Sequence, residues 1–380
     1  MSGDRVKHIS LIAVFIVALC SAGLSQLILD LVGGKTPQVA RLFMQKPTKA
    51  NLRAFEADLQ DNCQLAKRLR PWMQYARFMI LGELGDEVVA GRCGWLFYKP
   101  AVQYLIEPGP PQTDESQGDI FSAVISFHDQ LANRGIQLIL VPVPNKASVY
   151  PDMLTPRART PDIAVSCRAL ETISRLRQAG IEVVDLFAVF GQARAALPHE
   201  HTATYYLSQD SHWSPSGVQL AAKTVGQRIL ELGWAKKGHV EYALEPVMIQ
   251  RHGDILTMIQ VPQVERHFEP EHIHCTQVVN SATNQPYRDD SNSEILVIGD
   301  SFLRIYSRDE PGTAGFVEHL GQELGLPVTS IVNDGGASTL VRQQLSRNPK
   351  LLANKKVVVW EFVERDIRFG TEGWQIVPLP

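Results

Sequence analysis

The chain has little excess charge and no pattern that would hold a structural metal. Its 37 Lys and Arg residues nearly balance 40 Asp and Glu residues, which gives a formal net charge of -3. No basic surface is implied, so we do not expect nucleic acid to be a partner. The five cysteines include no CxxC pair, which removes the support for a structural zinc site. We predict a function that requires neither a metal nor a cofactor.

The cysteines leave the redox state of the chain open. Cys20 lies in an apolar N-terminal stretch, whereas Cys63, Cys93, Cys167 and Cys275 lie in more polar sequence. In an oxidising compartment these four thiols can pair in more than one way. A Cys63–Cys93 bond is the pairing we favour, and four free thiols are the alternative.

Residues 1–35 have the pattern of a membrane segment. The stretch from Ile9 to Leu29 contains no charged residue, and about 20 such residues span a bilayer core. Arg5 and Lys7 precede it and are expected on the cytoplasmic side. We therefore predict an N-terminal transmembrane helix that anchors the chain to the inner membrane, with the remainder in the periplasm. A cleaved signal peptide is the alternative, because Cys20-Ser21-Ala22 resembles a small-residue cleavage site.

The rest of the chain divides into a helical part and an alternating part. Residues 36–90 repeat apolar side chains at helical spacing, which predicts a helical stalk or lead-in. Residues 91–380 alternate between strands and helices, which indicates an α/β domain with a parallel sheet covered on both faces. Residues 235–293 lack a clear period and are predicted to be an insertion. The predicted strands are 94–98, 136–143, 181–186, 294–298, 328–332 and 356–362, and the predicted helices of this domain are 120–134, 161–179, 214–232, 312–325 and 338–346.

A serine follows one of the apolar strands. Gly299-Asp300-Ser301 comes directly after Ile295-Leu296-Val297-Ile298, and active sites of α/β folds lie at the carboxyl ends of strands. The hydroxyl would stand at the mouth of the sheet, and the backbone N–H of Ser301 would be free to bind an oxyanion. The tripeptide by itself is weak evidence, because it is often only a turn.

A second motif, Asp210-Ser211-His212, precedes a predicted helix that begins with Ser214-Pro215. A serine is a poor nucleophile without a base, and histidine is the usual base, oriented by a carboxylate. Asp210 lies two residues before His212 and can reach the second nitrogen of the ring. Helix capping by Asp210 or Ser214 is the alternative role. The two motifs together predict a catalytic triad of Ser301, His212 and Asp210.

Both motifs resemble the SGNH hydrolase fold, and more closely its subgroup of AlgX/AlgJ-like alginate O-acetyltransferases. In the SGNH fold the serine block comes first, whereas here the Asp/His block precedes it, so the order is circularly permuted. The resemblance covers about residues 90–370, and the N-terminal anchor makes the chain more similar to the AlgJ type. The segments that carry it are Gly94-Trp95-Leu96-Phe97, Pro144-Asn145-Lys146, Asp210-Ser211-His212-Trp213, Gly253-Asp254-Ile255, Gly299-Asp300-Ser301-Phe302 and Trp360-Glu361-Phe362.

The resemblance implies a three-layer α/β/α fold and acetyl transfer in two steps. A membrane-bound O-acyltransferase would supply the acetyl group, and Ser301 would hold it as an ester. His212 would act as general base while Asp210 orients its ring. A hydroxyl of an extracellular polysaccharide, alginate or another exopolysaccharide, would then accept the group.

The resemblance also implies an oxyanion site, and positions beside His212 or at strand ends suggest substrate contacts. The oxyanion would be held by the N–H of Ser301 and by a glycine, for which Gly335 is favoured over Gly336. The family's third block contains an Asn, which Trp360-Glu361-Phe362-Val363 lacks. Candidate substrate contacts, with core packing, a turn or a salt bridge as alternative roles, are Trp213, Asn145, Lys146 and Arg365.

Two other functions use the same residues differently. A polysaccharide acetyl esterase would share the triad and differ only in the second step, where water attacks. A non-catalytic carbohydrate-binding scaffold would be expected to lack a triad member, and all three are present.

Overall fold

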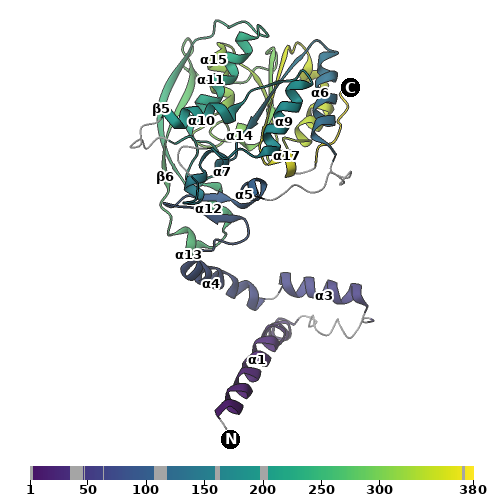
Figure 1. Ribbon diagram of the computed structural model, residues 1–380, viewed down its shortest axis with the longest axis vertical. Coiled ribbons are helices and arrows are strands. Elements are labelled where there is room, and N and C mark those ends of the chain that lie inside the picture. Colours follow the sequence, from purple (N-terminus) through teal and green to yellow (C-terminus); the bar gives the residue numbers. More distant parts are fainter. Residues whose placement is uncertain are drawn as a thin grey trace. The chain divides into compact units, whose positions relative to one another are not determined.

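The computed structural model describes residues 3–34, 46, 48–62, 64–106, 118–158, 163–196, 204–369 and 373–380 (Figure 1). The chain divides into two compact units. The first comprises residues 1–84 with 260–267, and the second comprises residues 85–259 with 268–380.

The first unit is helical. Its helices are α1 (Gly3–Val32), α3 (Lys49–Asn62), α4 (Gln64–Leu81) and α13 (Pro262–Glu265). Helix α1 contacts α4, where the backbone N–H of Gln64 donates to the side chain of Gln26 at 3.0 Å. The helical spacing predicted after residue 36 is confirmed in α3 and α4.

The predicted N-terminal transmembrane helix is not confirmed. Residues 9–29 lie within the single helix α1, but no helix among the described residues is both long enough and apolar enough to cross a membrane. The end of α1 is polar, because the buried side chain of Gln26 donates to Asp30 at 2.8 Å. The expected transmembrane helix is therefore not found in the described part of the chain. Of the favoured cysteine pair, Cys93 is a free, exposed thiol and Cys63 lies outside the described residues.

The second unit is built on a parallel sheet of five strands in the order β4-β3-β10-β8-β9. Every pairing in it is parallel, as the near-continuous apolar runs predict for strands buried on both faces. Because the strands share one direction, their carboxyl ends meet at one edge of the sheet. The strands are β3 (Gln137–Val143), β4 (Glu182–Val183), β8 (Ile295–Gly299), β9 (Thr329–Val332) and β10 (Val357–Val363).

Helices cover both faces of this sheet (Figure 1). One core lies between the sheet and α10, α11 and α15, and another lies between the sheet and α6, α9 and α16. Along β3, Ile139 and Val141 point into the first core, whereas Leu138 and Leu140 point into the second. This three-layer α/β arrangement confirms the predicted fold. The bounds are α6 (Ile120–Ala132), α9 (Cys167–Gln178), α10 (Leu186–Ala196), α11 (Pro215–Glu231), α15 (Phe316–Leu324) and α16 (Leu340–Arg347).

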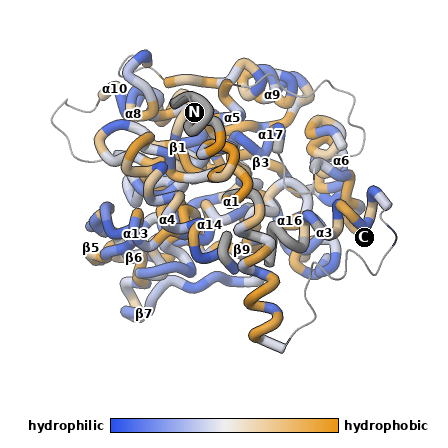
Figure 2. The backbone as a smooth tube through the Cα atoms, turned by 90° about the horizontal axis from the view of Figure 1, so that it is seen from below, coloured by the Kyte–Doolittle hydropathy of each residue, from blue (hydrophilic) through white to orange (hydrophobic). Residues whose placement is uncertain are grey.

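Residues 235–293 contain regular structure that the sequence did not reveal. Strands β5 (Tyr242–Arg251) and β6 (Glu271–Asn280) pair antiparallel along their whole lengths, and β7 (Gln285–Pro286) extends them. Most of β5 is exposed or half-buried, and Figure 2 shows much hydrophilic colour along the three strands. Because β5 lacks an apolar alternation, the sequence did not reveal these strands, and the insertion at residues 235–293 stays a prediction.

Short elements complete the second unit and connect its strands. They are β1 (Val88–Ala90), β2 (Leu96–Tyr98), α5 (Lys99–Ile106), α7 (Lys146–Val149), α8 (Pro151–Leu154), α12 (Asp254–Met258), α14 (Ser301–Arg304), the 3-10 turn Pro349–Leu352 and α17 (Asp366–Phe369).

Candidate active site

Ser301 lies where β8 passes into α14. The strand ends at Gly299, and Ser301 is the first residue of the helix. Asp300 caps that helix, because its Oδ1 accepts the backbone N–H of Phe302 at 2.9 Å. The cap fixes the turn and leaves the half-buried Ser301 at the carboxyl edge of the sheet.

His212 and Asp210 lie in the turn that precedes α11. The cap of that helix is Ser214, whose Oγ accepts the N–H of Gly217 at 3.2 Å, so Asp210 is free for another role. Asp210 Oδ1 lies 2.6 Å from His212 Nδ1 and also accepts the backbone N–H of His212 at 3.1 Å. His212 Nε2 lies 2.8 Å from Ser301 Oγ. The structure thus brings the three predicted triad residues together, from segments 89 positions apart.

The electrostatic environment of the His212–Asp210 pair stabilises the protonated form of the His212 imidazole. Burial acts to lower the pKa of His212, but the Asp210 carboxylate and the bond to it, with Asp254 and Asp300, raise that pKa above its ordinary value. For Asp210, burial opposes ionisation, but His212 and Arg251 hold its pKa well below the usual range. His212 is therefore a base whose protonated form is stabilised by its neighbours.

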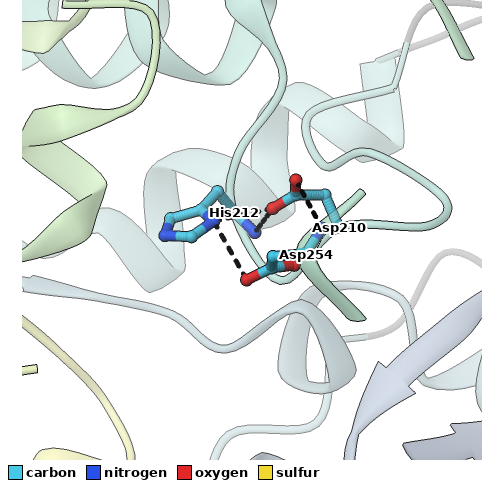
Figure 3. Close-up of side chains that lie close together, drawn as sticks. All are labelled: Asp210, His212 and Asp254. Carbon is cyan, nitrogen blue, oxygen red and sulfur yellow. Dashed lines mark hydrogen bonds and ion pairs between the residues drawn. The ribbon is translucent and has the colours of Figure 1, made fainter. Parts of the chain in front are cut away.

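Asp254 is a second carboxylate beside the same ring nitrogen. Its Oδ2 lies 3.5 Å from His212 Nδ1, and Figure 3 shows both aspartates on one side of the ring, with the other nitrogen turned away. Asp254 also accepts the backbone N–H of Ser211 at 2.6 Å, while its own N–H donates to Asp210 at 3.1 Å. Gly253-Asp254-Ile255 is one of the segments that resemble the family, but the sequence analysis predicted no role for Asp254.

Gly253 lets the segment after β5 approach the catalytic turn closely. A Cβ atom at this position would lie 2.5 Å from the backbone nitrogen of Asp210 and would also collide with the carbonyl group of Gln209. The preceding residues bring Arg251, whose Nη2 lies 3.3 Å from Asp210 Oδ2. The end of β5 therefore supplies the cation Arg251, and the start of α12 supplies the carboxylate Asp254.

The main chain of residues 208–210 is held by opposite charges. Glu271 accepts the N–H of Ser208 at 2.8 Å and the N–H of Gln209 at 3.0 Å. Lys146 Nζ donates to the carbonyl of Ser208 at 2.8 Å and to that of Asp210 at 2.9 Å. A carboxylate thus binds the amides of this turn while an ammonium group binds its carbonyls.

Three residues predicted to contact substrate have buried side chains in the structure, and their role as substrate contacts stays a prediction. Trp213 is fully buried, stacks on Phe316 and donates to the carbonyl of Phe302 at 3.1 Å. Asn145 is 1% exposed, and its backbone N–H donates to Glu364 at 2.9 Å. Lys146 is 4% exposed and holds the catalytic turn.

The remaining candidates lie at the same edge of the sheet. Gly335 is exposed, has a φ of 66° and belongs to the turn after β9. Its oxyanion role stays a prediction. Arg365 lies over the ring of Tyr98, 5.3 Å from the centroid. Burial raises the pKa of Asp300, and the charge of Arg365 limits that rise.

A metal ion fits this site less well than a hydrogen-bonded triad does. In the described part of the chain, Asp210, His212 and Asp254 form the one group whose ligand atoms are close enough to share an ion. However, His212 already bonds to Asp210 and Ser301, and the guanidinium of Arg251 is beside Asp210. A cation there would face both a positive neighbour and occupied ligand atoms.

Comparisons with known proteins agree with this geometry. A family model for the SGNH hydrolase-like domain of the acetyltransferase AlgX matches residues 88–364. The probable alginate O-acetylase AlgJ of Pseudomonas fluorescens is 24% identical over 306 residues, which cover 78% of this chain and 72% of that protein. The alginate biosynthesis protein AlgX of Pseudomonas aeruginosa is 25% identical over 254 residues, or 62% of this chain and 48% of AlgX.

Solved structures show the same fold. The O-acetyltransferase domain of Pseudomonas putida AlgJ superposes with a TM-score of 0.58 at 22% identity, over 74% of this chain and 92% of that domain. The structure of Pseudomonas aeruginosa AlgX gives a TM-score of 0.54 at 20% identity, over 73% of this chain and 62% of AlgX. Because the family model spans most of the chain, including the Asp/His turn and the serine, this protein belongs to the family of SGNH hydrolase-like domains of the acetyltransferase AlgX.

Proposed function

We propose that this protein is an O-acetyltransferase that places acetyl groups on hydroxyls of alginate or a similar exopolysaccharide, through an acetyl ester of Ser301. The observation that carries the proposal is the relay in which His212 bonds to Ser301 at 2.8 Å and to Asp210 at 2.6 Å. Membership of the AlgX family supports acetyl transfer as the reaction.

In the first step, Ser301 Oγ attacks the carbonyl carbon of an acetyl donor while His212 Nε2 takes the hydroxyl proton. Asp210 stabilises the imidazolium that forms. The tetrahedral oxyanion is bound by the N–H of Ser301, which has no hydrogen-bond partner among the described residues, and by the turn that contains Gly335. His212 then gives its proton to the leaving group, and the acetyl-serine ester remains.

In the second step, a sugar hydroxyl attacks the ester carbonyl while His212 takes its proton. The new ester bond forms, the bond to Ser301 Oγ breaks, and His212 returns the proton to the serine. An esterase would follow the same course with water as the attacking group.

We also propose where the enzyme works and what supplies its donor. The uncharged stretch 9–29, preceded by Arg5 and Lys7, supports a catalytic domain in the periplasm beside the inner membrane. A membrane-bound O-acyltransferase is the proposed donor partner. Fractionation of cells that express the tagged chain tests the location, and recovery of the full-length protein in the cytoplasmic fraction would contradict it.

The experiment is incubation of the full chain with 4-nitrophenyl acetate, with and without alginate oligosaccharides. We expect mass spectrometry to detect acetylated oligosaccharide. The Ser301→Ala variant should transfer acetyl groups at a rate at least about 10³-fold lower than wild type. Ser174→Ala, at an exposed serine on α9, is the matched control and should keep full activity. Acetate release that is unaffected by oligosaccharide would instead identify an esterase, and an active Ser301→Ala would reject the site.

A further inference from the structure

Glu361 is a buried acid packed directly behind the nucleophile. It lies on β10, which pairs with β8 in the register Trp360 to Ile298, and its side chain is 0% exposed. A Cβ atom at Gly299 would lie 3.0 Å from the Cβ of Glu361 and would overlap its carboxyl group. The absence of a side chain at 299 is therefore what allows Glu361 to reach the turn that carries Ser301.

A hydrogen bond joins Glu361 to Asp300. The backbone N–H of Asp300 donates to Glu361 Oε2 at 3.0 Å, whereas the buried Glu361 Oε1 has no hydrogen-bond partner among the described residues. Asp300 in turn caps the helix that begins at Ser301. Glu361 thus reaches the nucleophile through one intervening residue.

A negative charge on one of two neighbouring buried carboxyl groups disfavours ionisation of the other, which favours a proton on one member of this pair. Among the described residues no Lys or Arg forms an ion pair with Glu361. Burial, followed by the charges of Asp300 and Asp366, raises the pKa of Glu361 well above its ordinary value.

Positive charges instead face Asp300. Burial raises its pKa, but Arg365, the Phe302 N–H and His212 act against that rise. Arg365 also opposes the effect of burial on Asp366, which lies on α17. Because Asp300 Oδ1 also accepts the Phe302 N–H, which favours its charged form, we assign the proton of the pair to Glu361.

We propose that Glu361 is a positioning residue which, as a neutral carboxylic acid, ties the backbone and side chain of Asp300 to β10 and so fixes Ser301 against His212. This inference rests on the proposed function, since it concerns the same nucleophile. In this arrangement Glu361 donates its O–H to the Asp300 carboxylate and accepts the Asp300 N–H, so the residue directly before Ser301 is held at its backbone and at its side chain.

The test compares Glu361→Gln with Glu361→Met in the full chain. Gln is neutral, donates through its amide N–H and accepts through its carbonyl, so the rate of Ser301 acetylation should stay within about 3-fold of wild type. Met has a similar length but makes neither bond, and we expect about a 10- to 100-fold lower acetylation rate with KM changed less than about 3-fold. Glu318→Met, at another buried acid outside the site, controls for general damage to folding.

The pH profile distinguishes positioning from a simple charge effect. Removal of an ionised Glu361 would lower the pKa of His212, so the acid limb of Glu361→Gln would move to lower pH by more than about 0.5 unit. We expect a shift below about 0.3 unit. A larger shift, a Gln variant as slow as Met, or a Met variant with the wild-type rate would each overturn the proposal.

Labelling of Ser301 by phenylmethylsulfonyl fluoride, followed by mass spectrometry, separates this inference from the proposed function. If wild type forms no acetyl-serine, the proposed function fails, yet the labelling rates still rank the Gln and Met variants. If Met does not fold by circular dichroism, the Gln variant alone decides, because its retained labelling rate and unmoved acid limb are both required.

Discussion

Asp254 gives the catalytic histidine a second anionic neighbour. Its Oδ2 is 3.5 Å from His212 Nδ1, compared with 2.6 Å for Asp210. Burial and the nearby Asp210 charge raise the pKa of Asp254 itself, so its negative charge is weaker at low pH. We therefore expect it to tune the basicity of His212 while Asp210 orients the ring.

Asp254→Asn should shift the pH profile more than the maximal rate. Because Asp254 contributes to the raised pKa of His212, its removal should move the acid limb about 0.5 unit to lower pH. The amide still accepts the N–H of Ser211, so the maximal rate should fall only about 3- to 10-fold. Acetylation rates measured from about pH 5 to 9 test this. An unmoved acid limb would show that Asp254 does not influence the imidazolium.

At the scale of elements, the catalytic turn depends on two side chains from elements outside the five-stranded sheet. Lys146 comes from α7 after β3, and Glu271 comes from β6 of the hairpin. Burial lowers the pKa of Lys146 to about 7, yet its two bonds to carbonyls need only N–H donors. Both hydrogen bonds from Lys146 to the catalytic turn therefore persist when its amine is neutral.

Lys146→Met should lower both stability and activity. We expect a loss of about 1–3 kcal/mol in the free energy of unfolding, because two buried carbonyls lose their donor, and about a 10-fold or greater loss in acetylation rate. Lys355→Met is the matched control, since this buried lysine also donates to two carbonyls, those of Ser291 and Ser293, at a distance from the triad. Equal losses of activity in the two variants would contradict a specific role for Lys146.

Sequence patterns predicted the elements whose packing is periodic. The apolar runs of β3, β8 and β10 are buried along nearly their whole lengths, so burial and pattern agree. The hairpin β5–β6 was not predicted because its exposed strand carries no apolar alternation, and Arg251 and Glu271 were missed with it. Sequence also could not distinguish a surface Trp213 from a core one, because that depends on Phe302 and Phe316 in three dimensions.

At the scale of the whole molecule, buried acids link stability to pH. Burial raises the pKa of Glu318, Glu364 and Asp366 to about 7. Between their ordinary values and pH 7 the folded state therefore holds more protons than the unfolded state, and stability falls as pH rises. His319 has the opposite effect on stability, because burial lowers its pKa to about 4. The three acids together have the larger effect.

We expect the free energy of unfolding to fall by about 1–3 kcal/mol between roughly pH 5 and pH 7. Urea unfolding followed by circular dichroism measures it. The double variant Glu318→Gln, Glu364→Gln should flatten the dependence, because two of the titrating acids are removed. A wild-type stability that rises across this interval would show that these acids are ionised in the folded protein.

Gly253 determines how closely the segment after β5 approaches the catalytic turn. The segment that follows the exposed strand β5 rests on the backbone of Asp210 only because position 253 carries no side chain. Position 253 is thus constrained by shape alone, whereas Arg251 of β5 and Glu271 of β6 are constrained by their contacts with the catalytic turn. A version of these strands grafted from a relative would have to carry a glycine at this position, because a side chain there would collide with the backbone of Gln209 and Asp210 and displace the aspartate from its histidine.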